Sequence, residues 1–581
     1  MAANNSHEVD QNDPKEFRVI FKFNRLAVWA VLAVLTFSWS NTFAEEMPQL
    51  TIVQSGTDPL IADLKALVID LADEKKAWDK SLYPTLELFL AGIDPKAPLQ
   101  LDILFDENAE QIYRILVPIL DKQKGQKVFL SDNVELLGID VEKDPADSNL
   151  KHLSEGYEGY LRFAHDYAFF APKGYQNLVP KDVEDPATTI QSYLDGKYDV
   201  AGGFTNPTTG VESRRSAIEA LSKEVLAGLK KKRSESAEEF ELRKLISKHS
   251  FDRLARYFSE AAELKFGWIT EADSGEGMLQ ISAIPETQLA EQFGRMGKLQ
   301  TQFAGVELPE TAMGTGRIVV PVGPFYTQQM KEFYELSLPL ALEKIESSDQ
   351  KPEQKTASKK ATELLYEVLE DSLEAGILDA VYRDEAAGDF QKVVIGVQAR
   401  STSKISEMLD QVALLDSRVT VKKDHETLGD VTIHQVKVDG IDAPFFTSFF
   451  GEGPLEISVG LSETVVWVGL GKDHQSLLKQ MVESAQEKGE SSAGSTILET
   501  RNHIAPLLKA ISAQAQASPD KNHPEIATYL KLAAESFDES NDLITGTMVK
   551  KEETIHGDLQ TSSGLMKFIG KAIANFAKEN L

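Results

Sequence analysis

Three segments of this chain share one order of elements: two β-strands joined by a polar turn, followed by an amphipathic helix. These segments are residues 266–299, 378–415 and 543–576. Their expected turns are 273–275, 387–389 and, in the third, either 556–558 or the charged run just before it, and all contain residue types that favour hairpins. Hairpins followed by helices predict mostly antiparallel sheet covered on one face by helices.

The helices in these segments follow the 3.6-residue period of an amphipathic helix, with one apolar stripe each. The stripes are Ile405, Met408, Leu409 and Val412 in the second segment, and Leu565, Phe568, Ile569, Ala572 and Phe576 in the third. We therefore expect an α+β fold of tandem units, each a mostly antiparallel sheet covered by amphipathic helices. The alternative, a doubly wound parallel sheet, requires regular β-α-β alternation, which the hairpins contradict.

A similar strand and helix are expected near residue 100. Leu101, Ile103 and Phe105 alternate as in a strand, and the apolar spacing within 112–120 predicts a helix. Asn108 and Gln111 have the spacing of a capping box at its start.

Polar segments without apolar periodicity indicate where the chain divides. The clearest is 346–361, which is rich in lysine and polar residues. The predicted organisation is a signal peptide over 1–44, a first α+β domain over 45–235, a second α+β unit over 236–350, a linker over 351–361, and a third α+β domain over 362–581 with a strand-strand-helix copy at its end.

The N-terminal region has the pattern of a secretory signal. A 12-residue apolar run, 26–37, follows four basic residues and precedes Thr42-Phe43-Ala44. Spanning a bilayer takes about 20 apolar residues, so cleavage after Ala44 is favoured over retention as a membrane anchor. The chain has no cysteine, which for a large exported protein favours the bacterial periplasm or cell surface.

Composition excludes several partners and chemistries. The formal net charge is -30, and such a surface repels nucleic acid and anionic lipid headgroups. Without cysteine there is no disulfide, thiolate ligand or thiol nucleophile. Gly314-Thr315-Gly316 lacks the third glycine of a dinucleotide-binding loop, and Gly469-Leu470-Gly471-Lys472 is followed by Asp473 where a phosphate-binding loop needs a hydroxyl residue. We expect no cofactor and no metal, and membrane contact only through the N-terminal segment if it is uncleaved.

One connection stands out as a candidate binding site. Phe445, Phe446, Phe449 and Phe450 lie between two strand patterns, bounded by proline and glycine. Exposed rings there would form an apolar ligand-binding or protein-binding patch, whereas rings folded over the sheet would form a satellite core.

Three functions remain open from the sequence. The first is a non-catalytic envelope protein that binds a protein or an apolar ligand. The second is a hydrolase whose site is assembled from distant residues such as His165, because catalytic triads are defined by geometry and not by sequence order. The third is a purely structural envelope component.

Processing of the N-terminus is the first testable expectation. If the signal is cleaved after Ala44, the mature protein begins at Glu45. Intact-mass measurement of the protein from an envelope fraction should give the mass of residues 45–581. Recovery of the full-length chain from the soluble cytoplasmic fraction would contradict export.

Overall fold

The structure is a computed structural model. It describes residues 50–105, 111–120, 124–233, 235–271, 273–488, 491–492, 494–517 and 524–580. The predicted signal peptide, 1–44, lies outside the described residues.

Strands occur throughout the described part of the chain. In chain order they are β1 (Leu50–Gln54), β2 (Leu99–Phe105), β3 (Gln111–Pro118), β4 (Ile139–Lys143), β5 (Leu150–Glu155), β6 (Gly159–Ala164), β7 (Tyr167–Pro172), β8 (Val200–Thr205), β9 (Ala261–Thr270), β10 (Ser274–Ala283), β11 (Gln300–Thr301), β12 (Gly314–Pro321), β13 (Ile377–Ala387), β14 (Phe390–Gln398), β15 (Val419–Leu428), β16 (Val431–Val438), β17 (Leu455–Leu461), β18 (Val465–Leu470), β19 (Ser491–Ser492), β20 (Thr496–His503), β21 (Leu543–Lys551) and β22 (Thr554–Ser562).

Helices connect the strands. They are α2 (Thr57–Lys65), η1 (Ala66–Leu71), α3 (Lys75–Ala77), η2 (Trp78–Leu82), α4 (Tyr83–Phe89), α5 (Lys124–Phe129), η3 (Leu130–Val134), η4 (Glu135–Leu137), η5 (Gln176–Leu178), α6 (Ala187–Leu194), α7 (Val211–Gly228), α8 (Ala237–Glu260), α9 (Gln288–Arg295), α10 (Pro324–Ser347), α11 (Pro352–Leu373), α12 (Thr402–Leu415), α13 (Pro444–Phe450), α14 (His474–Lys488), α15 (Ala505–Ala517), α16 (Pro524–Ser536) and α17 (Ser563–Asn580).

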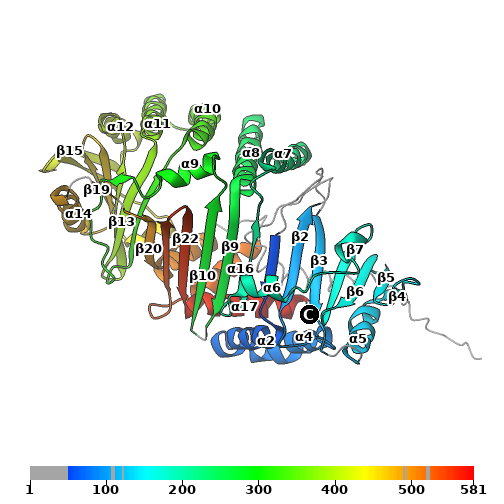
Figure 1. The fold of residues 1–581 in the computed structure, drawn as a ribbon. Coiled ribbons are helices and arrows are strands. Elements are labelled where there is room, and N and C mark those ends of the chain that lie inside the picture. Colours follow the sequence, from blue (N-terminus) through cyan, green and yellow to red (C-terminus); the bar gives the residue numbers. More distant parts are fainter. Residues whose placement is uncertain are drawn as a thin grey trace, which may run out of the picture.

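Twenty of the described strands form one sheet, so the fold is α+β with a large antiparallel sheet, as expected. Every pair of neighbouring strands in it is antiparallel. The pairings give the order β4-β5-β6-β7-β3-β2-β1-β8-β9-β10-β22-β21-β20-β12-β13-β14-β18-β17-β16-β15. Figure 1 shows the middle of this order, with β9 and β10 in green beside β22 in red.

The two halves of the sheet have the same strand order. From the centre outward, the first half runs β10-β9-β8-β1-β2-β3-β7-β6-β5-β4 and the second runs β22-β21-β20-β12-β13-β14-β18-β17-β16-β15. The separate two-residue pair of β11 and β19 is outside this sheet. If the strands of each half are numbered 1 to 10 along the chain, both halves have the order 10-9-8-1-2-3-7-6-5-4 from the centre of the sheet outward.

The central pair of strands lies where a twofold axis would place it. Both strands carry the sequence Gly-x-Leu-Gln-x-Ser, which begins at Gly277 in β10 and at Gly557 in β22. In the ladder Met278 pairs with Asp558, and Gly277 pairs with Leu559 while Leu279 pairs with Gly557. The two strands are thus related by a local twofold axis that passes between Met278 and Asp558, the second positions of the two motifs.

The main cores of the two halves also occupy matching places. Phe169, the third residue of β7, packs with α6 side chains such as Ile190. Trp467, the third residue of β18, packs with α14 side chains such as Leu477. Both rings are almost fully buried, at 1% and 2% exposure. In each half, therefore, the helix after the corresponding strand covers a large aromatic side chain.

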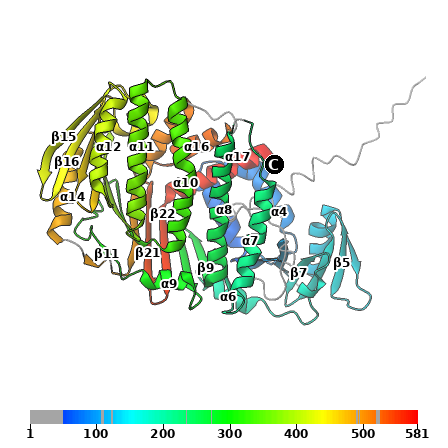
Figure 2. The same cartoon turned by 90° about the horizontal axis from the view of Figure 1, so that it is seen from above.

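Helices from both halves pack in a continuous row, α12-α11-α10-α8-α7, which Figure 2 shows side by side. The contact between halves is that of α8 with α10. There His249 Nε2 lies 2.9 Å from Glu332 Oε2, and the hydroxyls of Tyr257 and Tyr326 are 3.2 Å apart. The His249 hydrogen bond lowers the pKa of Glu332.

Local sequence favours α8, because Ser236 and Glu239 form a complete capping box at its start.

The C-terminal helix α17 joins the halves a second time. It packs against the first-half helices η1 and η2 and against α16. The closest approach is at Gly570, where an added Cβ would lie 2.0 Å from the main-chain oxygen of Leu67. Ala574 and Ala577 are fully buried in the same contact. Small residues on this face allow the helix backbones to approach closely.

The three hairpins expected from the sequence form, as β9–β10, β13–β14 and β21–β22. In the third, the turn is the charged run at Glu552 and not 556–558. The tandem arrangement is not confirmed. By strand order β9–β10 corresponds to β21–β22, whereas β13–β14 corresponds to β2–β3.

Two local predictions are wrong. The helix expected over 112–120 is largely strand β3, and the end of this strand is buried on both faces: Leu116 contacts one core, and Val117 contacts another. The expected linker 351–361 is mostly helix, since α11 begins at Pro352 and buries Ala357 and Ala361. The domain boundaries at 235 and 350 stay predictions.

The α17 contact generates a testable prediction. Gly570→Ala should lower the free energy of unfolding by about 1–3 kcal/mol, because the methyl group meets backbone that cannot move aside cheaply. Alanine alone would favour the helix by up to about 1 kcal/mol. Denaturant titration of both proteins measures the difference.

Gly294→Ala is the matched control, because Gly294 also lies in a helix but has nothing within 4 Å of its added Cβ. This variant should be as stable as the parent or slightly more stable. Equal effects of the two substitutions would contradict the close α17 contact.

Candidate functional site

The four phenylalanines of the candidate site lie on one short helix, α13. Pro444 occupies the first turn, where its missing N–H costs nothing, and Gly451 ends the helix with a φ of 91°. Rings four residues apart stack on each other: the Phe445 and Phe449 centroids are 5.8 Å apart, and those of Phe446 and Phe450 are 6.3 Å apart.

Burial divides these rings into two kinds. Phe449 and Phe450 are each 8% exposed and pack with Leu455 and Ala510 in a satellite core between the sheet and α15. Phe445 is half-buried against the same core, whereas Phe446 is 37% exposed. Thus α13 buries Phe449 and Phe450 against the sheet and leaves the Phe446 ring at the surface.

A pocket opens beside the exposed ring. Its empty volume is about 280 Å³, including space open to solvent. The lining residues are Ile441, Phe446, Thr447, Phe450, Gly451, Gly453, Pro454, Leu455, Gly471 and Lys472. Sequence analysis identified the connection that carries Phe446 and Phe450 but missed Leu455, Gly471 and Lys472, because β17 and the end of β18 reach this place only through sheet pairing.

Lys472 is the one charged side chain that lines this pocket. Its Nζ lies 5.9 Å from the centre of the Phe390 ring. The same ring packs against Gly451, where an added Cβ would lie 2.9 Å from it. No carboxylate forms an ion pair with Lys472 in the described part of the chain. The lining therefore combines apolar side chains with the backbone of three glycines, one hydroxyl group and one cation.

A buried carboxyl group adjoins the aromatic cluster on the sheet. Asp384 in β13 pairs with Val393 in β14, and Val393 packs against the phenylalanines. Among the described atoms, Asp384 Oδ1 has no hydrogen-bond partner. Burial first, and then the charge of Glu385, raise the pKa of this carboxyl group to about 7. The neutral form therefore persists to a higher pH than in an ordinary carboxyl group.

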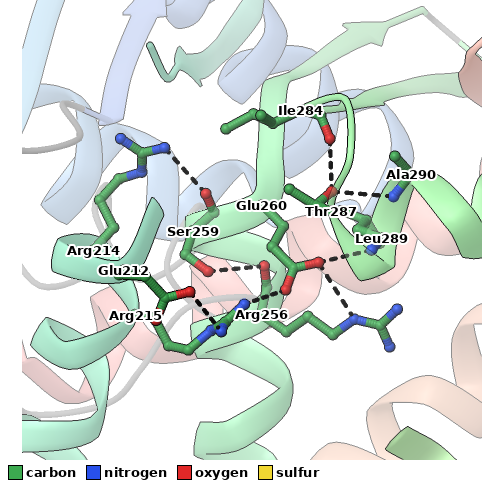
Figure 3. A network of polar contacts seen from close by, with 10 residues as sticks. All are labelled: Glu212, Arg214, Arg215, Arg256, Ser259, Glu260, Ile284, Thr287, Leu289 and Ala290. Atoms are coloured by element: carbon green, nitrogen blue, oxygen red, sulfur yellow. Dashed lines mark hydrogen bonds and ion pairs between the residues drawn. The ribbon is translucent and has the colours of Figure 1, made fainter. Parts of the chain in front are cut away.

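A second buried carboxylate, Glu260, was not indicated by any sequence motif. It is 1% exposed and forms ion pairs with Arg215 of α7 and Arg256 of α8, the latter at 3.8 Å. Its Oε2 also accepts a 2.7 Å hydrogen bond from the Leu289 N–H at the start of α9. Figure 3 shows these groups converging from three helices. This network holds α7, α8 and α9 together.

The histidines relevant to a hydrolase lie apart from one another. His165 sits in the β6–β7 turn and donates from Nε2 to the Val183 main-chain oxygen at 2.8 Å. His474 hydrogen-bonds to Ser458 Oγ at 2.7 Å, but both residues are buried, at 0% and 1% exposure. A nucleophile there cannot meet a substrate in this conformation.

A third histidine has the geometry of a general base. His503 Nδ1 lies 2.6 Å from Asp542 Oδ1, whose other oxygen accepts from the Ala505 N–H at 3.0 Å. Asp542 is fully buried, and the His503 side chain is 23% exposed. Buried aspartate orients the ring as in catalytic dyads. In the described part of the chain, no hydroxyl group that could act as a nucleophile is hydrogen-bonded to the His503 ring.

The described residues contain no group of three or more acidic or histidine side chains placed to hold a metal ion. No helix among them is long and apolar enough to cross a membrane. Comparison with protein-family models, with curated proteins and with solved structures finds no match.

The raised pKa of Asp384 generates a pH prediction. Between about pH 4 and 7 the folded protein keeps a proton that the unfolded chain has released, so the free energy of unfolding falls as pH rises through this window. Asp384→Asn removes the titrating carboxyl group and therefore this loss of stability at high pH. The variant should exceed the parent in stability by about 1–3 kcal/mol at pH 8 and match it more closely at pH 4.

Denaturant titrations at both pH values measure this. Asp389→Asn, an exposed carboxyl in the turn of the same hairpin, is the control and should leave the pH profile unchanged. A stability difference for Asp384→Asn that is the same at pH 4 and pH 8 would contradict the assignment.

Proposed function

We propose that this protein is exported and binds a partner protein or an apolar ligand without transforming it. The binding element in this proposal is α13 together with its adjoining pocket. The supporting observation is Phe446, a large ring that is 37% exposed while its neighbours hold it in place. Aromatic side chains fixed at the surface are typical anchors of protein and ligand contacts.

Rigid presentation supports binding rather than accidental exposure. Phe446 stacks on Phe450 with an interplanar angle of 24° and meets Phe445 edge to face at 5.5 Å. A ring held in this way loses little side-chain entropy on binding. The pocket beside it is lined by both apolar and polar groups.

We further propose that the halves of the sheet are tandem copies of one α+β unit. Their identical strand order and the shared Gly-x-Leu-Gln-x-Ser sequence support this origin. In this proposal the partner site is a feature of the second copy alone, because α13 lies between β16 and β17, and the corresponding strands β5 and β6 are joined by residues 156–158.

The proposed location is the bacterial periplasm or cell surface. It rests on the apolar segment 26–37 with its basic flank and on the absence of cysteine. A net charge of -30 argues against nucleic acid as the partner.

A hydrolase is the second candidate, and the His503–Asp542 pair favours it. A buried aspartate that orients a partly exposed imidazole is half of a catalytic triad. The attacking nucleophile would have to be supplied by the substrate or by a bound water molecule. A purely structural envelope role is the third candidate and requires no exposed anchor.

The decisive substitution is Phe446→Ser. Changing all four phenylalanines would empty a core, since Phe449 and Phe450 are buried, whereas Phe446 alone can be changed with the fold intact. Capture of partners or apolar ligands from envelope extract by the immobilised variant should fall at least about tenfold relative to the parent, as for loss of a binding anchor.

Leu414→Ser is the control, because Leu414 is also an exposed apolar residue, at 61%, but lies on α12. It should capture as the parent does. Circular dichroism should be the same for all three proteins. Undiminished capture by Phe446→Ser would rule out α13 as the binding element.

A further inference from the structure

The strand β15, at one end of the large sheet (Figure 1), contains an irregular segment in its middle. In the described part of the chain β15 pairs with β16 alone, so its other side is an edge of the sheet. Between Lys422 and Glu426 the register with β16 shifts, so that three residues of β15, 423–425, face one residue of β16, His434. Bulges of this kind keep an exposed edge from pairing with another strand.

His434 holds this bulge in place. Its Nδ1 lies 3.0 Å from the main-chain nitrogen of Asp424, whose φ of 51° lies in the left-handed region. A main-chain N–H can only donate, so Nδ1 is the acceptor and the imidazole is neutral in this conformation. The His434 side chain is 3% exposed and has little access to water. The bulge and the neutral state of His434 therefore depend on each other.

The same aspartate offers a partner to the protonated ring. Asp424 Oδ1 lies 3.7 Å from His434 Nδ1, and the Asp424 side chain is 76% exposed. When Nδ1 takes a proton from solvent, two N–H groups face each other and the main-chain hydrogen bond breaks. The Asp424 carboxylate is then the nearby acceptor for the new N–H. The two charge states of the ring thus select different atoms of one residue.

The other charged groups around the ring balance each other. Lys423 of β15 and Asp410 of α12 influence His434, but they form an ion pair in which the Lys423 Nζ lies 3.0 Å from both carboxylate oxygens. From β17 the residue paired with His434 is the uncharged Val459.

The helices over this face contribute apolar side chains, with Ile405 and Leu409 from α12 and Val368 from α11. Burial lowers the pKa of His434 from its ordinary value of 6.5, and the charge of Asp424 opposes this shift. The neutral form therefore predominates at pH 7, and the ring takes up a proton only in more acidic solution.

We propose that His434 is a pH-sensitive latch for the edge strand β15. While neutral, it holds the 423–425 bulge. When protonated, it releases the Asp424 N–H, and the bulge rearranges around the new contact with the carboxylate. The ladder pairs on both sides of the bulge, such as Val421–Val436 and Thr427–Thr432, do not involve the imidazole, so the change is confined to the edge.

Hydrogen exchange of the purified full chain, followed by mass spectrometry, tests the latch between pH 7.5 and pH 5. Labelling times are scaled so that an unfolded peptide exchanges equally at both pH values. Protection of peptides within 419–428 should fall by about three- to thirtyfold at pH 5, because a released ring with an ordinary pKa takes up a proton that the latched ring resists.

His434→Asn should abolish this fall, because its amide oxygen accepts from the Asp424 N–H near the position of Nδ1 and does not titrate. His425→Asn is the matched control, since His425 is an exposed histidine of the same bulge. It should show the same pH dependence as the parent.

Asp424→Asn tests the latch without changing the buried ring. Asparagine tolerates the left-handed backbone and keeps the main-chain N–H, but it removes the carboxylate that stabilises the protonated ring. The fall in protection should therefore move to lower pH.

Three results would each overturn the proposal: equal protection of 419–428 at both pH values in the parent, pH dependence that survives in a folded His434→Asn variant, or an unshifted profile for Asp424→Asn.

Discussion

The rest of the structure depends on the ladder between β10 and β22. Nine residue pairs join these strands, from Ser274–Ser562 to Ser282–Thr554. Without the ladder, each half would present the unpaired backbone of a central strand to solvent, which is an open template for aggregation. The ladder instead makes one continuous sheet. Helix contacts across the same boundary, α8 with α10 and α17 with η1, bury side chains on either side of it.

The near-symmetry of the halves makes their differences informative. α17 has 18 residues and crosses to the first half, whereas α9, in the matching place after β10, has eight. The second half also carries α13 where the first has only a turn. Added connections on a shared scaffold are the places where function usually resides, because they change without disturbing the sheet. The candidate pocket lies at one such connection, and its lysine comes from the end of β18.

Sequence reasoning succeeded where the signal was local. The turn at Gly388 is a two-residue hairpin, and Ile405 and Leu409 are buried on one face of α12, as their spacing predicted. It failed at β3, because the buried residues Ile112, Leu116 and Ile119 have the spacing of a helical stripe, although they belong to a strand whose end is buried on both faces. It failed at the start of α11, because the buried face there is made of alanines such as Ala357, which leave no apolar stripe in a polar segment.

The amino-acid sequence by itself determined that hairpins and helices alternate, that the sheet is antiparallel, and that four phenylalanines gather in one connection, since turns and periodicity act between residues close in the chain. Only the tertiary structure decided that Phe446 is exposed while Phe449 and Phe450 are buried, that Lys472 stands beside them, and that two halves share one sheet. The shared sheet depends on pairing between strands hundreds of residues apart, such as β10 with β22, and no local pattern specifies that register. The burial of the phenylalanines depends on the packing of α13 against α15, which no pattern within either helix specifies.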